Sequence, residues 1–449
     1  MERCTAKINV LSRIVRFFCF RFAMRRQKGY NNRAITIGRH RENWKEKNKL
    51  KKVLLIVSSL SGGGAEHVAR KNLEILLREK DFDVAVLTCD KALWDQYPVK
   101  QYLAKDFRKV RGPGKVLATL GIPENYKITA RCLQEFQPDI IHMHNYIPFS
   151  PSMLRALKEY KEKYGCKVIL THHTYSYICT NDSLYNYSQD KLCEKCIGTF
   201  DTTIIRDNCA NNRLVSLAKF LQKNEMSKFF ADLVDIHVSP SDFLKSELLK
   251  ANPQIKVEVV RNPCVDKIEP VCLKEKEDTA VFFGRISKEK NIVEFARRFM
   301  QTQSPLKLLI IGDGPEAGKL KELLKETDHK KIEFINRFLK SDELYETIKT
   351  AKFFVLPSIW FENSPVAIVE AINWSMIPLV SSIGGMKELI DLFGVGYTFN
   401  PMDDHEGTDT LKTAYKQYES DVASLPQAKG RLNQFTTQAY GRYIRTLYE

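Results

Sequence analysis

The sequence lacks an uninterrupted apolar run in its amino-terminal region, and this absence excludes two kinds of leader. Arginines interrupt the apolar positions every few residues at the start of the 449-residue chain, so this region cannot span a bilayer. It also lacks the apolar core and the small-residue cleavage site of a secretory signal peptide. With no export signal, we expect a cytoplasmic protein whose eleven cysteines are mostly reduced thiols.

The chain has little net charge outside its first 52 residues. The formal charge is +16, but residues 1–52 hold 16 Lys and Arg against 3 Asp and Glu, so only +3 remains for residues 53–449. The main body therefore offers no general basic surface, and nucleic acid is not an expected partner.

The basic leader, residues 1–51, carries apolar side chains at helical spacing between its arginines. These apolar residues are Ile8, Leu11, Val15, Phe18 and Phe22. Such a segment predicts an amphipathic helix on an anionic membrane surface, which for a cytoplasmic protein is the inner face of the membrane. A disordered basic tail is the alternative.

Two common phosphate-binding motifs are missing. Gly62, Gly63 and Gly64 follow an apolar strand, but the third glycine of a G-x-G-x-x-G fingerprint would fall at His67. No Lys-Ser/Thr pair follows the glycines either, so a P-loop is excluded. The glycines still allow backbone to approach a ligand closely.

Two successive series of buried strands and helices predict the fold. The first starts with a strand at 52–58, a glycine turn, a helix at 67–77 and a strand at 83–87, which together form a βαβ unit. A second series starts with strands at 257–260 and 280–283. We therefore predict an α/β protein with two facing Rossmann-like domains, whose strands end at a common ligand cleft.

The predicted domains follow from this pattern and from a run of prolines between the two series. After the leader we expect a first domain at 52–250, which contains a cysteine-containing insertion, and a second domain at 251–431. A final helix is expected at 432–449.

Glu362 and Glu370 flank the start of a helix that follows an apolar strand. Ser364 is the predicted N-cap and Pro365 the predicted first helical residue. The free amides and positive end of such a helix attract a phosphate or diphosphate. The two carboxylates suit hydroxyls instead, as on a sugar or a ribose, so the pattern predicts a nucleotide-sugar site. Taken alone, two glutamates on a solvated surface would look the same.

Arg285 and Lys290 follow another strand of the second series. Because the carboxyl ends of parallel strands meet at one edge, we expect these cations near the helix start. Arginine gives bidentate contacts and lysine a point charge, which together suit a diphosphate.

Four cysteines lie close together in the sequence: Cys179, Cys193, Cys196 and Cys209. Their segment is polar and rich in tyrosine, so we predict a tetrahedral structural zinc site. Small buried hydrophobic residues are the alternative.

Residues 52–449 resemble the retaining nucleotide-sugar glycosyltransferases of family 4, which have the GT-B fold. The resemblance is strongest at 281–390 and rests on motifs in the family's order. They are Phe283-Gly-Arg-Ile-Ser-Lys-Glu-Lys-Asn291, Ile311-Gly-Asp-Gly-Pro315, Pro357-Ser358, the glutamates at 362 and 370, and Gly384-Gly385 with Glu388. Ser364 and Ser375 depart from the family's usual residues, and the first of these puts the donor sugar in doubt.

The resemblance implies roles for the matched residues. Arg285 and Lys290 would bind the donor diphosphate, Glu362 the transferred sugar and Glu370 the ribose. The helix start would meet the phosphates through Asn363, Ser364, Pro365 and Val366. Gly62 to Gly64 would let the nucleotide-sugar approach the first domain, and His144 would lie near the reacting centre, with His142, His172 and His173 as competitors.

The implied reaction is sugar transfer from a nucleoside-diphosphate sugar to a glycan or lipid-linked oligosaccharide acceptor, with retention and without a catalytic metal. Surface polysaccharide biosynthesis is the expected setting. A sugar-nucleotide epimerase, and an inactive or nucleic-acid-binding protein that uses the basic amino terminus, are the alternatives.

Overall fold

The computed structural model describes residues 50–91, 94–111, 114–199, 202–230, 232–326 and 331–449. Leu50 to Glu449 form one compact unit. The leader with its predicted membrane-surface helix lies outside the described residues, so that expectation stays a prediction. No described helix combines the length and apolar content needed to cross a bilayer.

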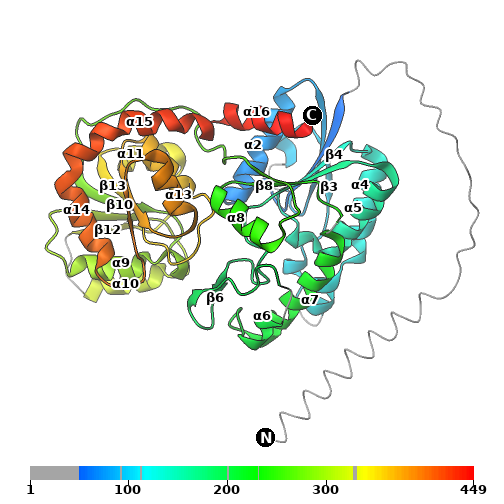
Figure 1. The fold of residues 1–449 in the computed structure, drawn as a ribbon, viewed down its shortest axis with the longest axis horizontal. Helices are drawn as coiled ribbons and strands as arrows, with labels where there is room; N and C mark the ends of the chain where they lie inside the picture. The colour runs from blue at the N-terminus through cyan, green and yellow to red at the C-terminus, as the bar shows by residue number, and fades with distance from the viewer. Residues whose placement is uncertain (1–49, 92–93, 112–113, 200–201, 231, 327–330) are drawn as a thin grey trace, which may run out of the picture. The chain divides into compact units, whose positions relative to one another are not determined.

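Two parallel sheets organise the chain (Figure 1). The first has the order β3 (Lys100–Leu103), β2 (Phe82–Thr88), β1 (Lys51–Ile56), β4 (Ile140–Met143), β5 (Lys167–Thr171), β8 (Ile236–Ser239) and β9 (Val257–Val259). The second has the order β12 (Ile332–Ile335), β11 (Lys307–Ile311), β10 (Glu277–Phe283), β13 (Ala351–Leu356), β14 (Ile377–Ser381) and β15 (Tyr397–Phe399). The predicted α/β class with two Rossmann-like sheets is confirmed.

Helices connect these strands and cover the sheets. Those of the first part are α2 (Gly64–Arg78), α3 (Gly114–Leu120), α4 (Pro123–Phe136), α5 (Ser150–Tyr164), α6 (Thr203–Arg206), α7 (Arg213–Phe230) and α8 (Asp242–Ala251). Those of the second are α9 (Ile292–Met300), α10 (Ala317–Glu326), α11 (Ser341–Ile348), α12 (Val366–Asn373), α13 (Gly384–Phe393), α14 (Glu406–Asp421), α15 (Leu425–Gly430) and α16 (Thr437–Tyr448). Short 3-10 turns include η4 (Lys288–Lys290).

β9 extends the first sheet further along the chain than the sequence pattern indicates. The sequence pattern groups the strand at 257–260 with the second series, but Val257 to Val259 pair in parallel with β8 in the first sheet. A short apolar strand is compatible with either sheet, and only its pairing assigns it.

Each sheet has one point where the strand order reverses. In the first, β1 lies between β2 and β4, and in the second, β10 lies between β11 and β13. Ligands of open parallel sheets bind at the carboxyl ends of strands on the two sides of such a point. A ligand-binding site is therefore expected at the loops after β1, β4, β10 and β13.

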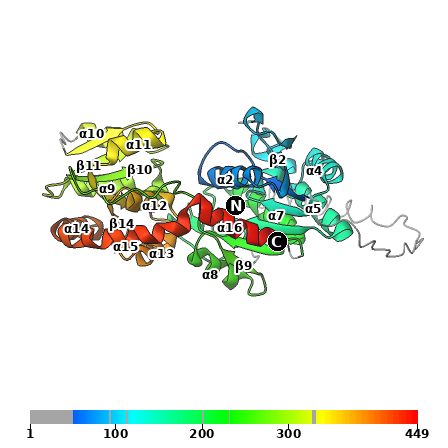
Figure 2. The same ribbon diagram turned by 90° about the horizontal axis from the view of Figure 1, so that it is seen from above.

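The C-terminal helix α16 packs on the first sheet although it follows the second. Tyr440, Ile444 and Tyr448 are buried in the same apolar cluster as Val53 and Leu55 of β1. Figures 1 and 2 both show α16 beside α2. The final helix predicted at 432–449 is thus present, and it ties the end of the chain to the beginning of the fold.

A glycine at the carboxyl edge of the second sheet gives a stability prediction. Gly312 has φ of +148°, and a Cβ there would lie 1.8 Å from the carbonyl oxygen of Gly284. We expect Gly312→Ala to lower the free energy of unfolding by about 1–3 kcal/mol, measured by urea unfolding. Gly318→Ala is the control, because no heavy atom lies within 4 Å of its added Cβ. Equal stability of the two variants would contradict the close packing.

Candidate functional site

The loops that follow β10 and β13 meet at the reversal point of the second sheet. The backbone amide of Ile359 donates to the carbonyl of Glu289 at 2.9 Å. Lys290 Nζ lies 2.5 Å from Glu362 Oε1 in an ion pair. The structure therefore brings together two residues that the sequence placed 72 positions apart. Arg285 lies on the same loop after β10 and is exposed.

Glu362 is held by more donors than the sequence pattern revealed. Its side chain is nearly buried, and Oε1 also accepts from Ser358 Oγ at 2.9 Å and from Trp360 Nε1 at 2.7 Å. Together with Lys290, these donors hold the carboxylate in one orientation. Ser358 and Trp360 lie in the loop after β13, but nothing in their spacing signals that both turn back to Glu362.

The helix start differs by one residue from the prediction. Ser364 is not an N-cap, because α12 begins at Val366 and Pro365 occupies the cap position with extended backbone. The first backbone bond of this turn runs from the Ile368 amide to the Pro365 carbonyl at 3.1 Å. The amides of Val366 and Ala367 therefore precede the helical ladder, as a phosphate-binding helix end requires.

Gly385 lets α13 approach this loop closely. A Cβ on Gly385 would lie 1.9 Å from the carbonyl oxygen of Asn363, and the Gly385 amide donates to the Glu362 carbonyl at 2.7 Å. A side chain here would push the loop away, so the glycine positions both Glu362 and Asn363.

Glu370 lies within α12 and has a strongly perturbed carboxyl group. Burial raises its pKa from the ordinary value of 4.5 to about 7. The pKa of the Cys264 thiol is also raised, mainly by burial of that thiol and secondly by the charge of Glu370. A carboxylate that has lost water gains from hydroxyl donors of a ligand, which suits the predicted ribose contact.

His144 is less accessible than its predicted role requires. It is 2% exposed, and its ring nitrogens face Asn72 Nδ2 at 3.0 Å and His173 Nε2 at 3.2 Å. Burial lowers the pKa of His144 well below its ordinary value and that of His173 to about 4, so both are neutral at pH 7. A role for His144 at the reacting centre stays a prediction.

His173 contacts the loop that carries Glu362 and Asn363 before α12, which we call the helix-start loop. The sequence did not predict this contact. His173 is partly exposed, and its carbonyl oxygen accepts from Asn363 Nδ2 at 3.1 Å. This bond joins the segment after β5 to the loop that carries Glu362. The adjacent pair His172-His173 at a strand end was the available signal, but spacing alone could not rank the histidines.

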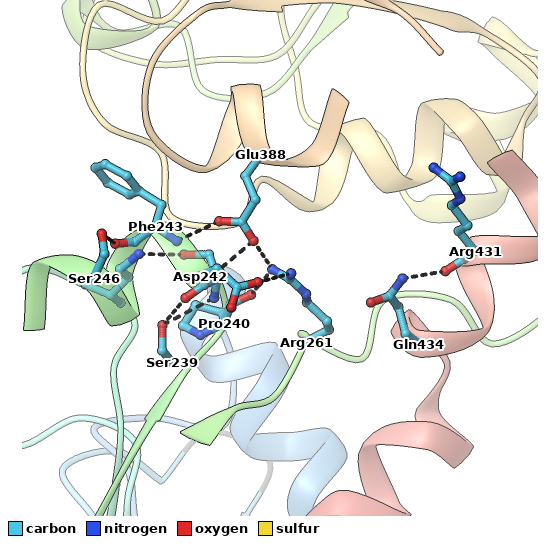
Figure 3. Close-up of polar contacts among 11 residues, drawn as sticks. Ser239, Pro240, Asp242, Phe243, Ser246, Arg261, Glu388, Arg431 and Gln434 are labelled. Atoms are coloured by element: carbon cyan, nitrogen blue, oxygen red, sulfur yellow. Dashed lines mark hydrogen bonds and ion pairs between the residues drawn. The ribbon is translucent and has the colours of Figure 1, made fainter. Parts of the chain in front are cut away.

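A second polar cluster joins α13 to α8 (Figure 3). The carboxylate of Glu388 accepts from the amides of Asp242 and Phe243, at 3.0 and 2.7 Å, and pairs with Arg261. Arg261 also pairs with Asp242 at 2.8 Å. Glu388 thus caps the start of α8, which explains physically why an acid follows the glycines at 384–385.

The glycines of the first domain occupy the predicted edge. Gly62, Gly63 and Gly64 are exposed between β1 and the first turn of α2. Gly62 has φ of +137°, a conformation that favours glycine. α2 begins at Gly64, three residues earlier than predicted, so the glycine turn is also the helix start.

The zinc site expected at Cys179, Cys193, Cys196 and Cys209 stays a prediction. In the described ranges, no three or more His, Cys, Asp or Glu side chains are arranged to hold a metal ion. Cys179 is buried in an apolar cluster with Tyr175, Ile178 and Leu184, and its Sγ accepts from the Leu184 amide at 3.4 Å. Cys209 is buried as well. Burial first, and then the charges of Cys193, Cys196 and Cys179, raise the pKa of the Cys209 thiol to about 12, so the four thiols lie near one another.

Two family models match consecutive parts of the chain. Glycosyltransferase Family 4 matches residues 62–266, and Glycosyl transferases group 1 matches residues 266–429. The chain therefore belongs to the group 1, family 4 glycosyltransferases, a family of retaining enzymes of class EC 2.4 with the GT-B fold.

Curated relatives are distant and match in part. A protein of Bacillus subtilis named as teichuronic acid biosynthesis glycosyltransferase TuaC is 22% identical over 57% of this chain and 56% of its own. An α-1,4-N-acetyl-D-galactosaminyltransferase of Campylobacter jejuni, named for a PP-undecaprenol-linked glycan, is 30% identical over 30% of this chain and 38% of its own. The chain thus spans about half or less of these relatives.

Solved structures share the fold over most of the chain. HepE of Anabaena in complex with UDP and glucose has a TM-score of 0.61 at 15% identity, covering 88% of this chain and 99% of its own. Sucrose-phosphate synthase of Thermosynechococcus elongatus has a TM-score of 0.64 at 15% identity, covering 89% and 98%. At this identity the likeness shows the fold.

Glu370 gives a prediction for stability against pH. Because its pKa is about 7, the folded protein keeps a proton that the unfolded chain releases from about pH 4.5 upward. Wild-type stability should therefore fall between these pH values, whereas Glu370→Gln has no group to ionise. We expect the variant's advantage to grow to about 1–3 kcal/mol by pH 8 in urea unfolding. A difference that does not change with pH would show that Glu370 ionises normally.

Proposed function

We propose that the protein transfers a sugar, of the hexose type, from a nucleoside-diphosphate sugar to a glycan or lipid-linked acceptor with retention of configuration. The observation that carries this proposal is the ion pair between Lys290 and Glu362 at the start of α12. A cation, free helix amides and an oriented carboxylate lie together at one reversal point. This set suits the diphosphate and the sugar of one ligand.

Each part of this set would act on a different part of the donor. Lys290, Arg285 and the first amides of α12 would neutralise the diphosphate as it leaves. Glu362 would accept from hydroxyls of the transferred sugar, and Glu370 from the ribose. Since the leaving diphosphate gains negative charge in the transition state, fixed positive groups at this point accelerate transfer.

The acceptor is proposed from the relatives rather than from the geometry. Their names give teichuronic acid biosynthesis and a PP-undecaprenol-linked glycan. The first name supports a role in surface polysaccharide biosynthesis, and the second supports a lipid-linked acceptor. The basic leader would then place the enzyme at the inner face of a membrane.

A panel of nucleoside-diphosphate sugars tests the donor site by thermal stabilisation. A ligand that binds the folded state alone raises the apparent stability by mass action, by about 2.7 kcal/mol at 100 times its Kd. We expect one or more donors to raise the Tm of the wild type and to raise that of Glu370→Ala much less. Equal shifts for the two proteins across the panel would remove Glu370 from the site.

Lys290 and Lys288 form a matched pair for turnover. Lys288 lies in the same turn, but it is exposed and pairs with Asp190 at 2.8 Å instead of Glu362. We expect Lys290→Ala to lower kcat by roughly 10²–10³-fold, as loss of a group that stabilises transition-state charge does. Lys288→Ala should retain near wild-type turnover. A similar loss in both variants would point to a general charge effect.

A further inference from the structure

A chain of buried hydrogen bonds runs from α16 through α2 to the histidines of the first sheet. Tyr448 hydroxyl lies 2.7 Å from His142 Nδ1 and 3.1 Å from Asn72 Nδ2. Asn72 Nδ2 lies 3.0 Å from His144 Nε2, and His144 Nδ1 lies 3.2 Å from His173 Nε2. Asn72 is fully buried, so water does not compete for these bonds.

Asn72 sets the direction of every proton in this chain. With its amide nitrogen toward the histidines, its two N–H groups face three acceptors: His144 Nε2, the Tyr448 hydroxyl and, at 3.1 Å, His142 Nδ1. Because the Tyr448 hydroxyl is closer to His142 Nδ1, at 2.7 Å, and donates to it, the two N–H groups are left for His144 Nε2 and for the oxygen of Tyr448. Its Oδ1 is then the atom without a partner among the described residues. In the opposite orientation, the buried NH₂ group would have no acceptor. Buried N–H groups without a partner are rarer than carbonyl oxygens without one.

The remaining protons follow one by one. Since His144 Nε2 accepts, a neutral His144 carries its proton on Nδ1 and donates to His173 Nε2. A neutral His173 then carries its own proton on Nδ1. On the other branch, Tyr448 donates to His142 Nδ1, and His142 Nε2 donates to Thr171 Oγ1 at 2.7 Å.

We propose that Asn72 and Tyr448 are positioning residues that fix His144 and His173 as Nδ1–H tautomers. His173, whose backbone carbonyl accepts from Asn363 in the loop that carries Glu362, thereby carries a hydrogen-bond donor and no lone pair on its second ring nitrogen, Nδ1. Within the proposed sugar transfer, on which this role rests, such a group binds an oxygen of the donor or acceptor and does not act as a base. The strongly lowered pKa values of these histidines agree with neutral rings.

Nitrogen NMR of the full chain labelled with ¹⁵N-histidine tests the tautomer directly. Long-range ¹H–¹⁵N spectra at pH 7.5 show which ring nitrogen carries the proton, and loss of signals in His173→Gln assigns His173. We expect the Nδ1–H form for His173 in the wild type. The Nε2–H form would overturn the proposal, whether or not a nucleotide-sugar is ever found to bind.

Tyr448→Phe and Tyr440→Phe form the matched variants. Both tyrosines are buried in α16, but the Tyr440 hydroxyl has no hydrogen-bond partner among the described residues. We expect Tyr448→Phe to give a mixture of His173 tautomers and to lower kcat for sugar transfer roughly 10–100-fold, as loss of an outer partner of a functional histidine does. Tyr440→Phe should keep the wild-type tautomer and kcat. If Tyr448→Phe matches Tyr440→Phe in the tautomer, the positioning role is wrong, and this comparison does not depend on turnover.

Discussion

The reversal of strand order between β10 and β13 is the constraint on which the site depends. Neither of the two loops would identify the site alone: the loop after β10 carries the three cations Arg285, Lys288 and Lys290, and the loop after β13 carries the buried Glu362. Because β10 and β13 are direct neighbours, their loops share one space, and Lys290 reaches Glu362. If another strand lay between them, about 4.8 Å would be added and the pair would not form.

The ion pair also explains how Lys290 and Glu362 can both be charged in a mostly buried position. Both side chains are mostly buried, which would be costly for either charge alone. Paired with Lys290, and with donors from Ser358 and Trp360, Glu362 keeps its orientation in the loop before α12. The pair thus leaves neither of these two charges uncompensated in the interior.

The first sheet is joined to the C-terminal helix by apolar packing and by hydrogen bonds to its histidines. α16 follows the second sheet, yet its Tyr448 lies among histidines of the first. Asn363 donates to the backbone of His173, and Glu388 caps α8, so residues of both sheets hold the same region. Substitutions in α16 can therefore reach the histidines although none of its residues lies at the helix-start loop.

The sequence by itself determined the fold class and the loops of the candidate site, because buried strands, glycine turns and helix starts are local patterns. It placed Arg285, Lys290 and Glu362 in loops that follow strands, and the structure brings Lys290 to Glu362. The binding roles of these residues and of Glu370 stay predictions. The sequence could not assign β9 to a sheet, or show which side chains surround His144, His173 and Cys179. Those outcomes depend on strand order, on which side chains meet in the interior, and on contacts such as Tyr448 with Asn72 that join residues 376 positions apart. Only the tertiary structure decides them, because no local preference carries information across that distance.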